Sequence, residues 1–109
     1  MREHFIEHSL FDNIPLDVMI YSPAHPIGIV QISHGMCEHK ERYIDFMHYL
    51  NQHGYVCIIH DHRGHGRSIK NNEDLGYFYT NGDQGMIEDL HQLTLLIKKR
   101  YPSLPLYLL

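Results

Sequence analysis

Tryptophan is absent from this 109-residue chain, and cysteine occurs only twice, as Cys37 and Cys57. Two cysteines do not form a disulfide framework, and Cys57 stands in an apolar run that is typical of a buried thiol. These features predict a reducing, cytoplasmic environment. No window holds the roughly 18–20 apolar residues of a membrane span, and the charged N-terminus lacks the apolar stretch of a signal peptide.

Basic charge is also scarce, since the formal net charge is −4 at pH 7 and the isoelectric point is near 6.2. A chain of this charge is not expected to bind nucleic acid or anionic membranes. Apolar residues make up 43% of the sequence, which suits a globular core. At this length we expect one domain at most.

The sequence does contain apolar, β-branched runs that alternate with amphipathic stretches. Strands are predicted at 4–10, 16–21, 27–32, 55–60 and 104–109. Helices are predicted at 41–53, which Gly54 ends, and from the N-cap Asp83 to about Arg100. A tight turn at 12–15 makes the first two strands antiparallel. The alternation that follows favours an α/β fold, with a mostly parallel sheet and helices on both faces.

Each predicted helix carries an apolar stripe that is expected to face the sheet. The first stripe consists of Tyr43, Phe46, Met47 and Leu50. The second consists of Ile87, Leu90, Thr94 and Ile97, with Met86 and Leu93 at its margin.

Two polar sequence motifs directly follow predicted strands. They are His34-Gly35-Met36-Cys37-Glu38-His39 and Asp61-His62-Arg63-Gly64-His65-Gly66-Arg67-Ser68. With Arg42-Tyr43, Asp89-Leu90 and Tyr101-Pro102 in this order, the whole chain resembles the monoacylglycerol lipase, lysophospholipase and serine aminopeptidase-like branch of the α/β-hydrolases. The resemblance implies that residues 1–109 are the N-terminal part of such a domain. It also implies a small lipid ester or other acyl substrate, and no cofactor or metal.

In that family the nucleophilic serine lies on a sharp turn directly after a strand such as 104–109, and the acid and histidine follow later. We therefore expect the sequence to stop just before this turn, with the catalytic triad outside it. Burying Leu106, Leu108 and Leu109 would contribute roughly 4–9 kcal/mol, at about 1.5–3 kcal/mol each. That is a large share of the roughly 5–15 kcal/mol by which a domain is stable, so an uncovered final strand also points to a fragment.

The resemblance places the oxyanion hole at Gly35 and Met36. In this fold one oxyanion donor is a backbone N–H in the turn after a buried strand, and by position it belongs to Met36. Gly35 permits the backbone conformation that turns this N–H toward a developing negative oxygen. The alternative is an ordinary turn between a strand and a helix.

Glu38 follows the oxyanion segment, and in similar lipases this stretch borders the substrate pocket. Its carboxylate is a candidate hydrogen-bond partner for a glycerol-like hydroxyl. Alternatively, Glu38 and Lys40-Glu41 form only the solvated first turn of the helix. Cys37 stands where related sequences often have glycine, which is a departure from the family pattern in this loop.

Ser68 is not expected to be the nucleophile, because Gly66-Arg67-Ser68-Ile69-Lys70 lacks the second glycine of a Gly-x-Ser-x-Gly elbow. The resemblance instead implies a structural role for this loop beneath the nucleophile turn. The residues assigned to that role are Asp61, Arg63, Gly64, His65, Gly66 and Ser68.

Two other functions remain open. His60, His62 and His65 have a spacing that suits zinc, although the residue before His65 is Gly64 rather than the usual aspartate. With 11 histidines in the chain, such clusters also arise by chance. A non-catalytic, truncated chain is the other alternative, and it would bind a polypeptide by strand addition along its last strand.

Overall fold

The computed structural model describes residues 1–34, 40–63, 68 and 82–109, and for 82 and 83 only the backbone. Its strands are β1 (Arg2–His8), β2 (Pro15–Tyr21), β3 (Gly28–Ile32), β4 (Tyr55–His60) and β5 (Leu106–Leu108). Its helices are α1 (Ile44–Gln52), preceded by the 3₁₀ turn η1 (Lys40–Tyr43), and α2 (Gly82–Arg100). Every predicted strand and both predicted helices are present, with ends that differ by a few residues.

The strands form one sheet in the order β1-β2-β4-β3-β5. β2 is antiparallel to both β1 and β4, whereas β3 is parallel to β4 and to β5. Four strands therefore run in one direction and β2 runs against them. This confirms a mostly parallel sheet with an antiparallel opening pair.

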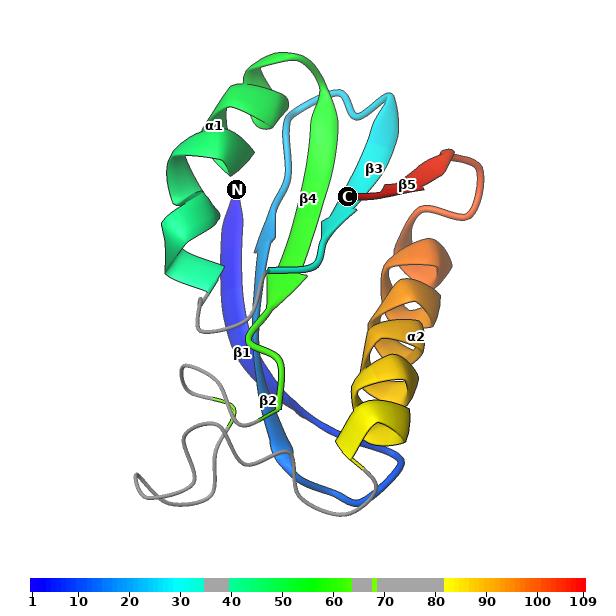
Figure 1. The fold of residues 1–109 in the computed structure, drawn as a ribbon. Coiled ribbons are helices and arrows are strands. Elements are labelled where there is room, and N and C mark those ends of the chain that lie inside the picture. The colour runs from blue at the N-terminus through cyan, green and yellow to red at the C-terminus, as the bar shows by residue number, and fades with distance from the viewer. Residues whose placement is uncertain (35–39, 64–67, 69–81) are drawn as a thin grey trace.

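Helices cover both faces of the sheet, as Figure 1 shows, with α1 on one side and α2 on the other. Alternate strand residues point to opposite faces. Val18, Val56 and Ile58 pack with Leu93 and Ile97 of α2. On the other face, Met19, Val30, Cys57 and Ile59 pack with Met47 of α1. Burial raises the pKa of the Cys57 thiol to about 12, so this cysteine is an inert core residue.

Two turns have the conformations that their residues favour. Gly54, which follows α1, has φ of +93°, a conformation that costs glycine little. Asn13 lies at φ of 64° between β1 and β2, in the left-handed region that asparagine tolerates. Both turns confirm the predicted breaks in the chain.

The predicted helix faces were partly wrong. Ile87 is 62% exposed and Phe46 is 38% exposed. The buried face of α2 instead carries Gly85, Asp89, Leu93 and Ile97. It is rotated from the apolar stripe because Asp89 is held inside the protein by a buried arginine, described below. In addition, Asp83 lies one residue inside α2 and is not its N-cap.

β5 is shorter than predicted and pairs with β3. Leu106 packs against the core beside α2, whereas Leu108 is 58% and Leu109 61% exposed. Neither described helix is long and apolar enough to cross a membrane, as judged over the described residues.

Candidate functional site

The two polar sequence motifs begin at the same edge of the sheet. β3 and β4 are parallel neighbours, so their carboxyl ends, at Ile32 and His60, lie side by side (Figure 1). Ser33-His34 and Asp61-His62-Arg63 continue from these ends. In open α/β sheets, ligands bind at the carboxyl ends of the strands. This edge is therefore the candidate functional site.

At this edge, His62 contacts both residues that follow β3. The backbone N–H of His62 donates to Nε2 of His34 over 2.8 Å. Nε2 of His34 therefore carries no proton. Nε2 of His62 lies 2.9 Å from Oγ of Ser33, and the rings of His34 and His62 are 4.3 Å apart. Contacts with His62 therefore connect the residues that follow β3 to those that follow β4.

His60 lies next to His62, only 1% exposed and with its ring 5.1 Å from that of His62. Within the described residues its Nε2 has no hydrogen-bond partner. Burial, reinforced by the charges that His62, His34 and Lys40 would carry, lowers the pKa of His60 well below 6.5. His60 therefore stays neutral in the folded protein.

Replacing His60 with leucine is expected to make the free energy of unfolding fall less steeply as the solution becomes mildly acidic. Below pH 6.5 the unfolded chain protonates His60 and the folded chain does not, so its contribution falls by about 1.4 kcal/mol per pH unit. Urea denaturation between about pH 7 and 5 measures this slope. His25→Leu, at an exposed loop position, should keep the wild-type slope. An equal slope in His60→Leu would contradict the assignment.

Lys40 is fully buried, so the alternative of a solvated first turn is wrong for this residue, whereas Glu38 lies outside the described residues. Its Nζ donates to Asp61 Oδ2 over 2.9 Å and to Glu41 Oε2 over 2.8 Å, and it also pairs with Asp17. Burial opposes the charge, but the hydrogen bonds to Asp17, Glu41 and Asp61 outweigh it and raise the pKa of Lys40. The backbone N–H of Lys40 donates to Asp61 Oδ1 over 2.8 Å. The ammonium is therefore held in place by carboxylates.

Arg63, in the loop after β4, is a second buried cation near this edge of the sheet. Its Nε donates to Asp89 Oδ2 over 2.8 Å, and Nη1 donates to Asp12 Oδ2 over 2.7 Å. Nη2 reaches the other oxygen of each carboxylate, and Ser9 donates to Asp89 over 2.6 Å. Burial opposes the charge of Arg63, but the bonds to Asp89 and Asp12 raise its pKa. Arg63 thus joins the loop after β4 to α2 and to the β1–β2 turn.

Gly85 leaves room for this arginine. A β-carbon at Gly85 would lie 2.8 Å from Nε of Arg63 and closer still to Cζ and Nη1. Gly85→Ala is therefore expected to lower the free energy of unfolding by about 1–3 kcal/mol, although alanine favours a helix by about 1 kcal/mol over glycine. Denaturant unfolding measures the change. His91→Ala, on the exposed face of α2, should change stability little, and equal effects would refute the steric explanation.

Of the residues predicted for the site, Asp61, Arg63 and Ser68 are described, and all are buried. Oγ of Ser68 accepts a hydrogen bond from the backbone N–H of Asp17 over 2.9 Å. The oxyanion candidates Gly35 and Met36, with Cys37 and Glu38, lie outside the described residues, as do Gly64, His65 and Gly66. Their predicted roles stay predictions.

The zinc alternative depends on His65, which lies outside the described residues, so it stays untested; the described part of the chain holds no group of three potential metal ligands. Sequence reasoning missed the partners of the buried cations. Asp17 offered one signal, as a lone charge between Leu16 and Val18 in an apolar strand.

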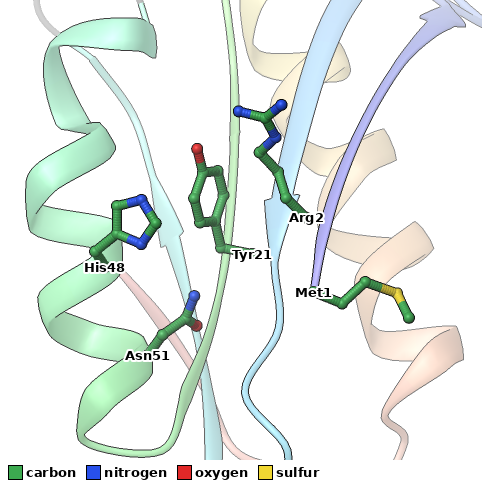
Figure 2. A pocket seen from close by; sticks show the side chains of 5 residues that line it. All are labelled: Met1, Arg2, Tyr21, His48 and Asn51. Atoms are coloured by element: carbon green, nitrogen blue, oxygen red, sulfur yellow. The ribbon is translucent and has the colours of Figure 1, made fainter.

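A surface pocket of about 390 Å³ lies away from these residues, between α1 and the first two strands. Figure 2 shows that Tyr21 projects between His48 and Arg2, with Met1 and Asn51 completing the wall. The rings of Tyr21 and His48 meet edge to face at 4.9 Å. None of the predicted site residues lines this pocket.

The fold compares closely with solved hydrolases. A thermostable carboxyl esterase from Bacillus coagulans, in complex with glycerol, matches with a TM-score of 0.90 and 31% identity, over 98% of this chain and 35% of that one. A soluble variant of a Saccharomyces cerevisiae monoglyceride lipase, in complex with a substrate analog, matches with a TM-score of 0.79 and 22% identity, over 99% and 34%. The sheet and its two helix layers are therefore part of an α/β-hydrolase fold.

Residues 24–109 match the Hydrolase_4 family, described as serine aminopeptidase, S33, and the chain belongs to this family. A monoglyceride lipase homolog of Monkeypox virus is 35% identical over 93 residues, which are 79% of this chain and 29% of that protein. The Mus musculus monoglyceride lipase is 33% identical over 84 residues, 77% and 26%. The chain thus spans less than a third of these relatives. Protein K6 of Vaccinia virus (strain Western Reserve) is 33% identical over 71% of this chain and 82% of its own.

Proposed function

We propose that this chain forms the oxyanion-hole side of a serine hydrolase that cleaves carboxylic esters such as monoacylglycerols or lysophospholipids. The observation that carries the proposal is the position of the end of β5. The backbone N–H of Ser33 donates to the carbonyl of Leu109 over 3.0 Å, and that of Leu109 donates to Gln31 over 2.8 Å. Leu109 therefore lies beside the residues that lead into Gly35 and Met36.

The mechanism is acyl transfer. A histidine takes the hydroxyl proton of a serine on the turn after a strand such as β5 and later gives it to the alcohol that leaves. The serine oxygen attacks the ester carbonyl, and the carbonyl oxygen becomes negatively charged. The backbone N–H of Met36 then donates to that oxygen, with Gly35 shaping the turn. One such donor lowers the barrier by roughly 2.7–4 kcal/mol. Since the sequence holds no Gly-x-Ser-x-Gly elbow, the proposal assigns the nucleophile, the acid and the histidine to residues outside 1–109.

The substrate class is supported by the relatives, which include monoglyceride lipases and a carboxyl esterase. We assign to Glu38 a hydrogen bond with a glycerol-like hydroxyl. With only two cysteines in the sequence, one of them a buried free thiol, we place the protein in the cytoplasm.

The chain of 109 residues is expected to hydrolyse p-nitrophenyl butyrate no faster than buffer, because it lacks the elbow. If a natural gene product continues from this sequence into a Gly-x-Ser-x-Gly elbow, we expect it to hydrolyse monoacylglycerols and to react with a fluorophosphonate. A colorimetric assay and mass spectrometry measure these outcomes. Enzyme-like hydrolysis by the chain alone, with contaminants excluded, would contradict the proposal.

A second candidate is a non-catalytic module that binds a polypeptide along β5. Two observations favour it: the exposed Tyr107 and Leu108 on that strand, and the match to Protein K6 over most of its length. The nucleotides after the Leu109 codon discriminate between the two. An open frame that continues into the elbow supports the hydrolase, and a stop codon leaves the binding module or a decayed gene.

A further inference from the structure

The segment 35–39, to which the oxyanion donor is assigned, has described residues on both sides. Ser33 and His34 precede it, and Lys40 follows it. All three form hydrogen bonds to two consecutive residues, Asp61 and His62. We propose that Asp61 and His62 are positioning residues, which hold the two ends of segment 35–39 in place for the reaction. This inference rests on the proposed function, because it assumes that the segment supplies the donor.

The upstream end is held by His34. This residue is 4% exposed, and its Nε2 accepts the backbone N–H of His62 over 2.8 Å. This bond requires an acceptor, so Nε2 of His34 takes part in it only without a proton. Ser33 adds a side-chain contact to the ring of His62 at 2.9 Å. His34, the residue before segment 35–39, is therefore hydrogen-bonded to His62, which follows β4.

The downstream end is held by Lys40 through two bonds to one carboxylate. Asp61 Oδ1 accepts the backbone N–H and Oδ2 accepts the ammonium, at 2.8 and 2.9 Å. Neither Lys40 nor the side chain of Asp61 is exposed to solvent. Hydrogen bonds to charged groups contribute more than neutral ones, so this two-point contact fixes both the main chain and the side chain.

Asp61 and His62 are themselves fixed to the rest of the fold. The backbone N–H of Asp61 donates to the carbonyl of Asp17 on β2 over 3.0 Å. Arg63, the next residue, is bonded to Asp89 of α2 and to Asp12. His34 and Lys40, which flank segment 35–39, are thereby placed relative to the sheet, and hence to Leu109, which pairs with Ser33. A shift of about 1 Å in a catalytic group can lower a rate 100-fold, which gives such contacts a function beyond stability.

The first test measures amide hydrogen exchange by NMR in the 109-residue chain. His34→Leu removes the acceptor and is expected to speed exchange of the His62 amide by roughly 2- to 12-fold relative to the β4 amides. His34→Gln, which offers an oxygen near the position of Nε2, should restore protection. Asp61→Ala should act likewise on the Lys40 amide, with Asp61→Asn as its conservative partner. Unchanged exchange of both amides in the Leu and Ala variants would overturn the inference.

The second test measures ester hydrolysis by the gene product that carries the elbow. His34→Leu is expected to lower kcat about tenfold or more at unchanged KM, whereas His34→Gln and the exposed His25→Leu should keep near wild-type values. If the His62 amide is released but kcat is unchanged, the positioning role is wrong. If Met36→Pro also leaves kcat unchanged, the proposed function itself has failed, and the exchange data alone decide whether Asp61 and His62 hold the segment.

Discussion

Arg63→Met is expected to lower the free energy of unfolding by about 3–5 kcal/mol, because it leaves the fully buried carboxylate of Asp89 without its cation. Asp12, 16% exposed, loses the same partner. Burial raises the pKa of Asp12, but the hydrogen bond and charge of Arg63 hold it below its usual range, so the variant should also let this pKa rise. Methionine keeps much of the side-chain volume. Equilibrium unfolding in urea measures the loss.

Arg100→Met is the matched control. Arg100 also pairs with a carboxylate, that of Glu3, but both side chains are well exposed, at 40% and 37%. Exposed pairs of this kind contribute roughly 0.2–1 kcal/mol. Equal losses in the two variants would show that burial does not determine the contribution of Arg63.

The second large effect concerns Met36. Proline at this position removes the backbone N–H, and in the elbow-containing gene product kcat is expected to fall by about 10²–10³-fold. Met36→Leu keeps the N–H and should stay close to wild type. Steady-state kinetics with a monoacylglycerol measures both variants. Comparable kcat values for the proline and leucine variants, both folded, would exclude the amide as a donor.

The strands could be predicted from the sequence because their signals are local. β-Branched residues in Gly28–Ile32 and Tyr55–His60 form short apolar runs, and Asn13 and Gly54 mark turns by their own conformational preferences. The polar motifs after β3 and β4 could also be recognised in the sequence. Parallel strands bring these two motifs to the same edge of the sheet, so the location of the candidate site followed from the fold class.

The helix faces and the buried charges could not be predicted in the same way. A hydrophobic pattern assigns charged residues to solvent, yet Asp89 and Lys40 are fully buried. Each can be buried because it pairs with an opposite charge, and that partner lies far along the chain: Arg63 precedes Asp89 by 26 residues, and Asp61 follows Lys40 by 21. Long-range ion pairs of this kind leave no periodic signal. They rotated the buried face of α2 and left Ile87 exposed.

A crystal structure of the elbow-containing gene product, with a phosphonate bonded to its nucleophilic serine, would show directly whether Met36 donates to the oxyanion. The phosphonate oxygen then stands where the oxyanion forms during hydrolysis. We expect the backbone nitrogen of Met36 to lie about 2.7–3.1 Å from this oxygen, with its N–H directed at it. A Met36 amide directed elsewhere, with the oxygen bonded to other groups, would contradict this expectation.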